Sequence, residues 1–220
     1  MEPQTISILL LGDEKVGKST FLSRISQGHS NLTGTAPITL LKDLDQPFIF
    51  EVSFGKRQYR LEFYDTSSPE NWRLLRPDLI LICFDISHRP SLINLQQVVR
   101  KQFLDRNPLT PPLITPPPRK PYTDNSQWIK EVRATFQTES TLPLAVLGLK
   151  RDLRTEDDPN GTLYPQEAYR VASEMRVDKY MECSAVTGEL LQLAFEEICQ
   201  MAVMTTTAEG GQSDGGCCLM

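Results

Sequence analysis

Short apolar runs alternate with segments of helical spacing along most of the chain. The strand-like runs are Ile6–Leu11, Phe48–Phe54, Gln58–Tyr64, Leu79–Phe84 and Leu144–Leu149, with a weaker one at Met181–Ser184. Helical spacing is found in Ser19–Ile25, Ser91–Leu104, Trp128–Phe136, Gln166–Met175 and Glu189–Met204. Strands that alternate with helices predict an α/β fold, with a mostly parallel sheet covered by helices on both faces.

Local signals refine this pattern. Phe48–Phe54 and Gln58–Tyr64 alternate apolar and polar residues around Gly55 and Lys56, which predicts a hairpin. Pro165 suits the first turn of the helix that follows it, where a missing N–H costs no hydrogen bond. Residues 26–47 carry Gly, Pro, Asn and Thr without a clear period, so we expect a loop there.

The 220 residues suffice for one well-buried domain, which we expect to span residues 1–204. Residues 105–126 hold 7 of the 16 prolines and must interrupt the helical pattern on either side. We interpret them as an extended loop inserted at a surface site; a docking segment in polyproline conformation is the alternative. Residues 205–220 begin with a stretch almost free of apolar residues, which predicts a flexible tail.

Composition narrows the classes of function. Apolar residues make up 40% of the chain and charged residues 23%, as in soluble globular proteins. The formal net charge of −5 argues against nucleic acid as the main partner. We expect neither a membrane-spanning helix nor a secretory signal, since the apolar runs are short. Cys83, Cys183 and Cys199 lie in or beside apolar or helical segments, which indicates buried, reduced thiols of a cytosolic protein.

A phosphate-binding loop lies between the first predicted strand and the first predicted helix. Its pattern, Gly12-x-x-x-x-Gly17-Lys18-Ser19, is complete. In such a loop the backbone N–H groups wrap a β-phosphate, and the helix N-terminus adds its positive end. We expect Lys18 to bridge the β- and γ-phosphates and Ser19 to ligate Mg²⁺. The predicted nucleotide contacts here are Gly12, Asp13, Glu14, Lys15, Val16, Gly17, Lys18, Ser19 and Thr20.

Three later segments, each at the end of a predicted strand, select the nucleotide. Asp65 can hold Mg²⁺ through water. Asp152, in Lys150-Arg151-Asp152, can accept two hydrogen bonds from guanine N1–H and N2–H₂, whereas adenine would leave the carboxylate unpaired. The backbone of Cys183-Ser184-Ala185 can reach the guanine O6. In this order the segments predict GTP or GDP as the ligand.

These motifs resemble the Ras superfamily of small GTPases, and within it the Rho family, over nearly all of residues 5–204. The matching segments include Asp65-Thr66, Glu70–Pro77, Leu79–Phe84, Leu147–Arg154 and Tyr180–Ala185. The resemblance implies a six-stranded sheet with five helices, GTP, GDP and Mg²⁺ as ligands, and two switch loops. It also adds Leu153 to the predicted nucleotide contacts. Leu149 stands where Asn or Thr is usual before Lys150, a variation typical of some fungal Rho-like proteins.

The second switch departs from the family pattern Asp-Thr-Ala-Gly-Gln-Glu. Pro69 takes the place of the glutamine that orients the attacking water, and proline has no side-chain amide for that role. Ser68 replaces the glycine whose N–H contacts the γ-phosphate; it keeps that N–H but has a narrower φ/ψ range. Glu14 falls where small residues are usual, and its charge is unfavourable beside a triphosphate. We therefore identify no catalytic residue and expect impaired hydrolysis.

The first switch is also irregular. The family has a Pro-Thr pair whose threonine ligates Mg²⁺, but here Pro37 is followed by Ile38. Thr39 and Thr35 are the nearest threonines, and we favour Thr39 as a third metal ligand beside Ser19 and Asp65. The alternative, in which no threonine reaches the metal, stays open.

The last four residues, Cys217-Cys218-Leu219-Met220, match a prenylation box that favours farnesyl. Thr205–Gly216 contains no Lys or Arg, so a single lipid on Cys217 predicts reversible membrane association. We expect the protein on the cytoplasmic face of membranes, chiefly the plasma membrane, with a cytosolic pool.

Two hypotheses of function remain. The first is a monomeric Rho-like switch that binds GTP tightly, hydrolyses it poorly, and works with effector proteins, exchange factors, activating proteins and a dissociation inhibitor. The second is an interaction module that keeps the fold but cycles little or no nucleotide. A small-molecule kinase would leave Lys150-Arg151-Asp152 and the prenylation box without a role.

Overall fold

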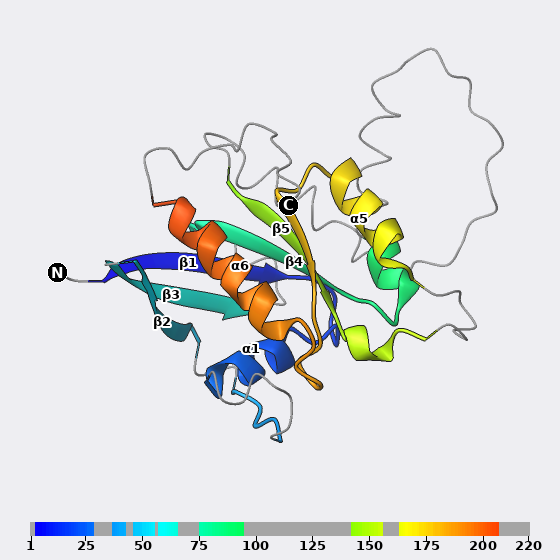
Figure 1. The fold of residues 1–220 in the computed structure, drawn as a ribbon, viewed down its shortest axis with the longest axis horizontal. Helices are drawn as coiled ribbons and strands as arrows, with labels where there is room; N and C mark the ends of the chain where they lie inside the picture. Colours follow the sequence, from blue (N-terminus) through cyan, green and yellow to red (C-terminus); the bar gives the residue numbers. More distant parts are fainter. Residues whose placement is uncertain are drawn as a thin grey trace, which may run out of the picture.

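The computed structural model describes residues 3–28, 37–42, 46–55, 57–65, 75–94, 142–155 and 163–206. Its centre is a six-stranded sheet with the order β2-β3-β1-β4-β5-β6 (Figure 1). The strands are β1 (Gln4–Leu11), β2 (Phe48–Phe54), β3 (Arg57–Asp65), β4 (Leu79–Asp85), β5 (Leu144–Leu149) and β6 (Lys179–Glu182). All neighbouring pairs are parallel except β2 and β3, which form the antiparallel hairpin predicted around Gly55. The predicted α/β fold with a mostly parallel sheet is confirmed.

Helices lie on both faces of this sheet. The described ones include α1 (Lys18–Ser26), α5 (Pro165–Glu174), α6 (Leu191–Met204) and the short 3-10 segment η3 (Arg151–Leu153). A further helix begins at residues 89–94. Figure 1 shows α6 crossing the strands on the near face. Among the helices of the described ranges, none is long and apolar enough to cross a membrane.

The period of two along the strands divides the core into two layers. Ile6, Ile8 and Leu10 of β1 point to the face that buries residues of α1 and α6. Leu9 and Leu11 point to the opposite face, which buries residues of α5. β4 and β5 are buried along their whole length, because both of their faces are covered. The continuous apolar runs at these two strands have this physical cause.

Several predicted boundaries differ from the structure by one or two residues, and two of them have a clear physical cause. The last strand ends at Glu182 rather than Ser184, because the N–H of Ser184 donates to the carbonyl of Glu189 within the following turn and no longer to β5. The last helix begins at Leu191 rather than Glu189, since Leu190 has a left-handed backbone with φ of 54°. Pro165 stands in the first turn of α5, as predicted. The predicted helix over residues 128–136 and the proline-rich segment lie outside the described residues.

Candidate nucleotide-binding site

The carboxyl ends of β1, β3, β4, β5 and β6 meet at one edge of the sheet, because these five strands are parallel neighbours. Leu10 of β1 is paired with Asp65 of β3, and Asp85 of β4 with Leu149 of β5. Ligands of open α/β sheets bind outside the carboxyl ends of the strands. Those residues predicted to contact the nucleotide that the structure describes therefore gather where such a sheet offers a site.

The phosphate loop takes its shape from two glycines and from the start of α1. Gly12 has φ of 141°, and a Cβ there would lie 2.2 Å from the carbonyl oxygen of Cys83. Gly17 has φ of 111° and is the N-cap of α1, without a side-chain cap. The first N–H groups of a helix have no partner within the helix. This end of α1 is thus suited to an anion such as a phosphate.

The side chain of Lys18 points back into the loop. It is buried, and its Nζ donates to the carbonyl oxygens of Gly12 at 2.9 Å and Asp13 at 3.1 Å. The same nitrogen lies 3.9 Å from Oδ1 of Asp65. A buried ammonium with two carbonyl partners keeps a positive charge fixed beside the amides of the loop. This arrangement favours binding of a polyanion.

The two predicted metal ligands with a defined position are in direct contact. Ser19 Oγ donates to Asp65 Oδ2 at 2.8 Å, although the residues belong to α1 and β3. Gln46 holds the backbone of Asp65 from the other side: its Nε2 donates to the Asp65 carbonyl at 2.8 Å, and the Asp65 N–H donates to its Oε1 at 3.2 Å. A hydroxyl and one carboxylate fit Mg²⁺, which takes few protein ligands and completes its shell with phosphate oxygens and water.

The base-binding side is built on the end of β5. Lys150 adopts a left-handed backbone with φ of 58°, which turns the chain into η3 and brings Asp152 toward the loop after β6. There Oδ1 of Asp152 accepts a hydrogen bond from the hydroxyl of Ser184. The N–H of Arg151 also donates to the carbonyl of Cys183 at 3.2 Å. The two predicted guanine-contacting segments are thus bonded to each other.

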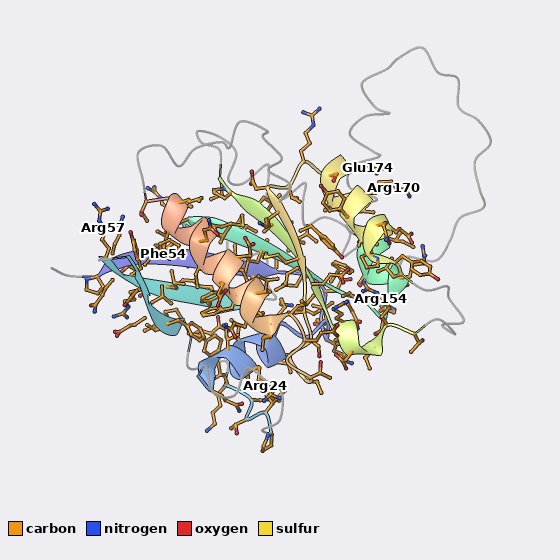
Figure 2. All side chains as sticks on the ribbon, in the orientation of Figure 1. Arg24, Phe54, Arg57, Arg154, Arg170 and Glu174 are labelled. Carbon is orange, nitrogen blue, oxygen red and sulfur yellow. The ribbon has the colours of Figure 1, made fainter. Side chains whose placement is uncertain are left out.

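Arg24 of α1 supports the loop that follows β6 (Figure 2). This residue was not identified from the sequence. The side chain is buried, with 2% of its surface exposed. Its Nε donates to the carbonyl oxygen of Ala185 at 2.7 Å, and its Nη2 to that of Val186 at 3.3 Å. One helix therefore contacts both ends of the site, the phosphate side through Ser19 and the base side through Arg24.

A second support is a group of ion pairs around Glu182, which the sequence also did not reveal. Arg154 makes two hydrogen bonds with this carboxylate, at 2.9 and 2.6 Å, and Arg151 lies 3.5 Å from it. The Tyr180 hydroxyl donates to the same group. Burial and the neighbouring Glu182 carboxylate raise the pKa of Tyr180 well above its usual range. These contacts tie η3 to β6.

The remaining predicted residues lie as follows. Glu14 and Lys15 are exposed, Thr20 is half-buried, and Val16 is buried in the core. Leu153 is 49% exposed beside Asp152, while Cys183, Ser184 and Ala185 are buried. Thr39 is exposed, and no contact that would make it a metal ligand is seen in the described residues. Thr35, Ser68, Pro69 and Cys217 lie outside the described residues.

Comparison with known proteins agrees with this geometry. A model of the Ras family matches residues 7–110 and 118–204, which is most of the chain. The chain belongs to the Ras family. GTP-binding protein rho2 of Schizosaccharomyces pombe is 23% identical over 235 residues, covering 100% of this chain and 98% of that protein. The predicted resemblance to Rho-like small GTPases is confirmed, and the fungal relative fits the variation at Leu149.

Membership of the Ras family also gives the coarse function. Ras-family GTPases bind GTP and GDP, and the Rho-like members generally interact with regulators and effectors. The contacts described above lie where a guanine nucleotide would span the loops after β1 and β5. The sequence motifs predicted the phosphate loop, Asp65, Asp152 and Ser184 as parts of this site, whereas the hydrogen bond between Asp152 and Ser184 is a finding of the structure.

Proposed function

We propose that this chain is a Rho-like GTP-binding switch that retains GTP because it hydrolyses it slowly. The observation that supports GTP binding is a pair of hydrogen bonds, one at each end of the site: Ser19 with Asp65, and Asp152 with Ser184. Binding and hydrolysis make separate demands on such a site. The first depends on amides, Lys18 and a metal, whereas the second depends on a group that orients water.

The proposed slow hydrolysis rests on two departures from the family pattern, at Pro69 and at Glu14. Pro69 stands at the glutamine position and cannot orient a water molecule through a side-chain amide. Glu14 is exposed on the phosphate loop, where its carboxylate would lie near the approach of an activating arginine. Both features reduce stabilisation of the transition state without removing any group that holds the nucleotide.

The proposed switch also binds Mg²⁺. Ser19 and Asp65 would be ligands of the ion, with Thr39 as the predicted third ligand. When bound, the ion neutralises charge on the phosphate oxygens. The chain's own contribution is to hold the Ser19 hydroxyl and the Asp65 carboxylate together, with Gln46 fixing the backbone of Asp65.

Nucleotide content and single-turnover hydrolysis test this proposal. Freshly purified protein should contain GTP, and its hydrolysis rate should fall below about 10⁻⁴ s⁻¹, the scale of intrinsic hydrolysis in Ras. Pro69→Gln should raise the rate, whereas Pro90→Gln, an exposed proline at the start of the helix of residues 89–94, should not. Bound GDP together with an ordinary rate would refute slow hydrolysis.

The second candidate function is an interaction module with little or no nucleotide cycling. The observation that favours it is Glu14, a negative charge placed on an exposed part of the phosphate loop. An empty site in the purified protein, with no binding of added GDP or GTP in the presence of Mg²⁺, would support this function and exclude the first.

The proposal includes reversible attachment to the cytoplasmic face of membranes, with the plasma membrane as the main site and a cytosolic pool. A farnesyl group on Cys217 would supply one lipid anchor, and one chain alone binds only marginally. Fractionation should show the wild type in both pools and Cys217→Ser in the cytosol only. Cys218→Ser is the matched control, since it keeps the box. Equal membrane content of wild type and Cys217→Ser would refute the anchor.

The proposed partners follow from the same family. They are effector proteins, exchange factors, activating proteins and a dissociation inhibitor that would bind the monomeric chain; nucleic acid is not among them. The net charge of −5 supports the last point, because nucleic acid repels an acidic surface. Binding of an effector to the GTP-loaded and GDP-loaded forms is the corresponding measurement, and equal affinity would refute a switch.

A further inference from the structure

An acidic residue at the end of β4 is part of the base-binding side of the site. Asp85 is the last residue of β4 and is paired in register with Leu149, the last residue of β5. Its side chain is buried, and Oδ2 accepts a hydrogen bond from Lys150 Nζ at 2.7 Å. The Lys150 side chain is more accessible, with 33% of its surface exposed.

The carboxylate of Asp85 is held in one orientation by its own loop. Oδ1 accepts hydrogen bonds from the Ser87 N–H at 2.8 Å and from the Ser87 hydroxyl at 2.6 Å. The backbone N–H of Asp85 donates to Ser91 Oγ at 3.0 Å. Both carboxylate oxygens therefore have partners, and only Oδ2 is directed to a charged group. A buried carboxylate with this many donors is a rigid partner for an ammonium.

Lys150 makes a second contact, and that contact reaches the phosphate loop. Its Nζ donates to the carbonyl oxygen of Lys15 at 2.7 Å. The side chain also runs beside Gly17, since a Cβ built on this glycine would lie 3.6 Å from Lys150 Cε. Lys150 thus bridges the loop after β1 and the end of β4, while its own backbone begins the turn that carries Asp152.

We propose that Asp85 is a positioning residue for guanine-nucleotide binding: its carboxylate holds the Lys150 ammonium against the Lys15 carbonyl. The inference rests on the proposed function, because it concerns the same nucleotide site. Without this carboxylate, Lys150 would keep one neutral partner and its ammonium could turn toward water. The bridge between phosphate loop and base loop would then loosen, and bound nucleotide would leave faster.

A double-mutant cycle separates this role from a merely structural one. The variants are Asp85→Asn, Lys150→Ala and the double variant, and the readout is the release rate of fluorescently labelled GDP at fixed Mg²⁺. Asp85→Asn should speed release about tenfold in the wild-type background, and by less than about twofold in the Lys150→Ala background. Equal acceleration in both backgrounds would overturn the inference, since Asp85 would then act without Lys150.

A control variant and a replacement variant accompany the measurement of GDP release. Asp78→Asn is the matched control, because Asp78 flanks the other end of β4 and bonds to the N–H of Ser7; it should leave release within about twofold of wild type. If Asp85→Asn does not fold, as judged by its thermal melt, Asp85→Ser replaces it in the cycle. Failure of the wild type to bind labelled GDP would instead overturn the proposed function, and this inference with it.

Discussion

The hydroxyl of Ser19 donates a 2.8 Å hydrogen bond to Oδ2 of Asp65, although 46 positions separate the two residues. The pair brings together the first turn of α1 and the last residue of β3. Gln46 also bonds to both backbone polar atoms of Asp65, which fixes the main chain that carries this carboxylate. Two of the three oxygen ligands predicted for Mg²⁺ are therefore placed by the fold itself.

Asp65→Asn should weaken the effect of Mg²⁺ on nucleotide retention. An amide oxygen lacks the charge that favours a divalent cation, so the Mg²⁺ concentration that halves the GDP release rate should rise about tenfold or more. Release of labelled GDP across a Mg²⁺ titration measures this. Asp178→Asn is the control, since Asp178 accepts from the N–H of Leu144 away from the site. An unchanged Mg²⁺ midpoint would argue against Asp65 as a ligand.

Arg24→Met should both destabilise the protein and speed nucleotide release. The substitution leaves the buried carbonyl of Ala185 and the more accessible carbonyl of Val186 without these donors, at a cost of about 1–3 kcal/mol in the free energy of unfolding. Arg24→Lys should restore only part of the effect, because an ammonium lacks the guanidinium fork.

Urea unfolding and release of labelled GDP measure these two effects of Arg24. Arg170→Met is the matched control, because Arg170 is exposed on α5 and its Nε lies 3.8 Å from a carboxylate oxygen of Glu174, one helical turn further along (Figure 2). That control should change the free energy of unfolding by less than about 0.5 kcal/mol. A wild-type release rate in Arg24→Met would show that the base loop holds its shape without Arg24.

Gly12→Ala should be strongly destabilising. The new Cβ would lie 2.2 Å from the Cys83 carbonyl oxygen, on a backbone with φ of 141°. We expect a loss of at least about 2 kcal/mol in the free energy of unfolding, measured by urea titration. Gly55→Asn is the comparison, because its φ is 61° and no atom lies within 4 Å of the added Cβ; it should cost less than about 1 kcal/mol. Similar costs for the two variants would contradict this reasoning.

The thiols of the core should be unreactive in the folded protein. Burial raises the pKa of Cys83 and of Cys199 to about 12, and it raises the pKa of Cys183 in the same direction. At pH 8 the thiolate fraction of the first two is roughly 10⁻⁴. In a chain with Cys217 and Cys218 replaced by serine, a thiol reagent should label three cysteines only after denaturant is added. Rapid labelling before denaturation would contradict this.

The same thiols predict how stability depends on pH. Their pKa values are higher in the folded state than the ordinary value of 9.0, so the folded state keeps protons that the unfolded state loses. Their contribution is present below pH 9 and falls as pH rises from about 9 toward 12, by up to about 1.4 kcal/mol per pH unit for each thiol. Urea unfolding at pH 7, 9 and 10 measures this slope, and Cys199→Ala should make it shallower.

Much of the fold could be predicted from periodicity alone. The runs at Leu79–Phe84 and Leu144–Leu149 are continuous because both faces of their strands are covered, and both proved to be central strands. Boundaries at the weaker elements were less secure. The backbone of Leu190 turns left-handed, which no apolar period reveals, and so the start of α6 was misplaced.

The site residues also fall into those that the sequence predicted and those that it did not. Gly12, Gly17, Lys18 and Ser19 act within one local turn, so their spacing along the chain already predicts their arrangement. Asp85 had a partial signal, since an acidic residue directly follows a predicted strand. Arg24 had none: a buried arginine and a surface one look alike in sequence. The predictions for Ser68, Pro69 and Cys217 rest on the sequence alone.

By itself, the sequence determined the strands and most of the helices of the described residues, the phosphate loop, the guanine preference and the family, because each depends on neighbouring residues or on motif order. Only the tertiary structure decided which distant residues support one another: Ser19 with Asp65, Arg24 with the carbonyl of Ala185, and Asp85 with Lys150. The physical reason is the strand order β2-β3-β1-β4-β5-β6, in which five parallel neighbours bring their carboxyl ends to one edge. Pairs separated by 46 to 161 positions can meet there, and no local pattern records their contacts.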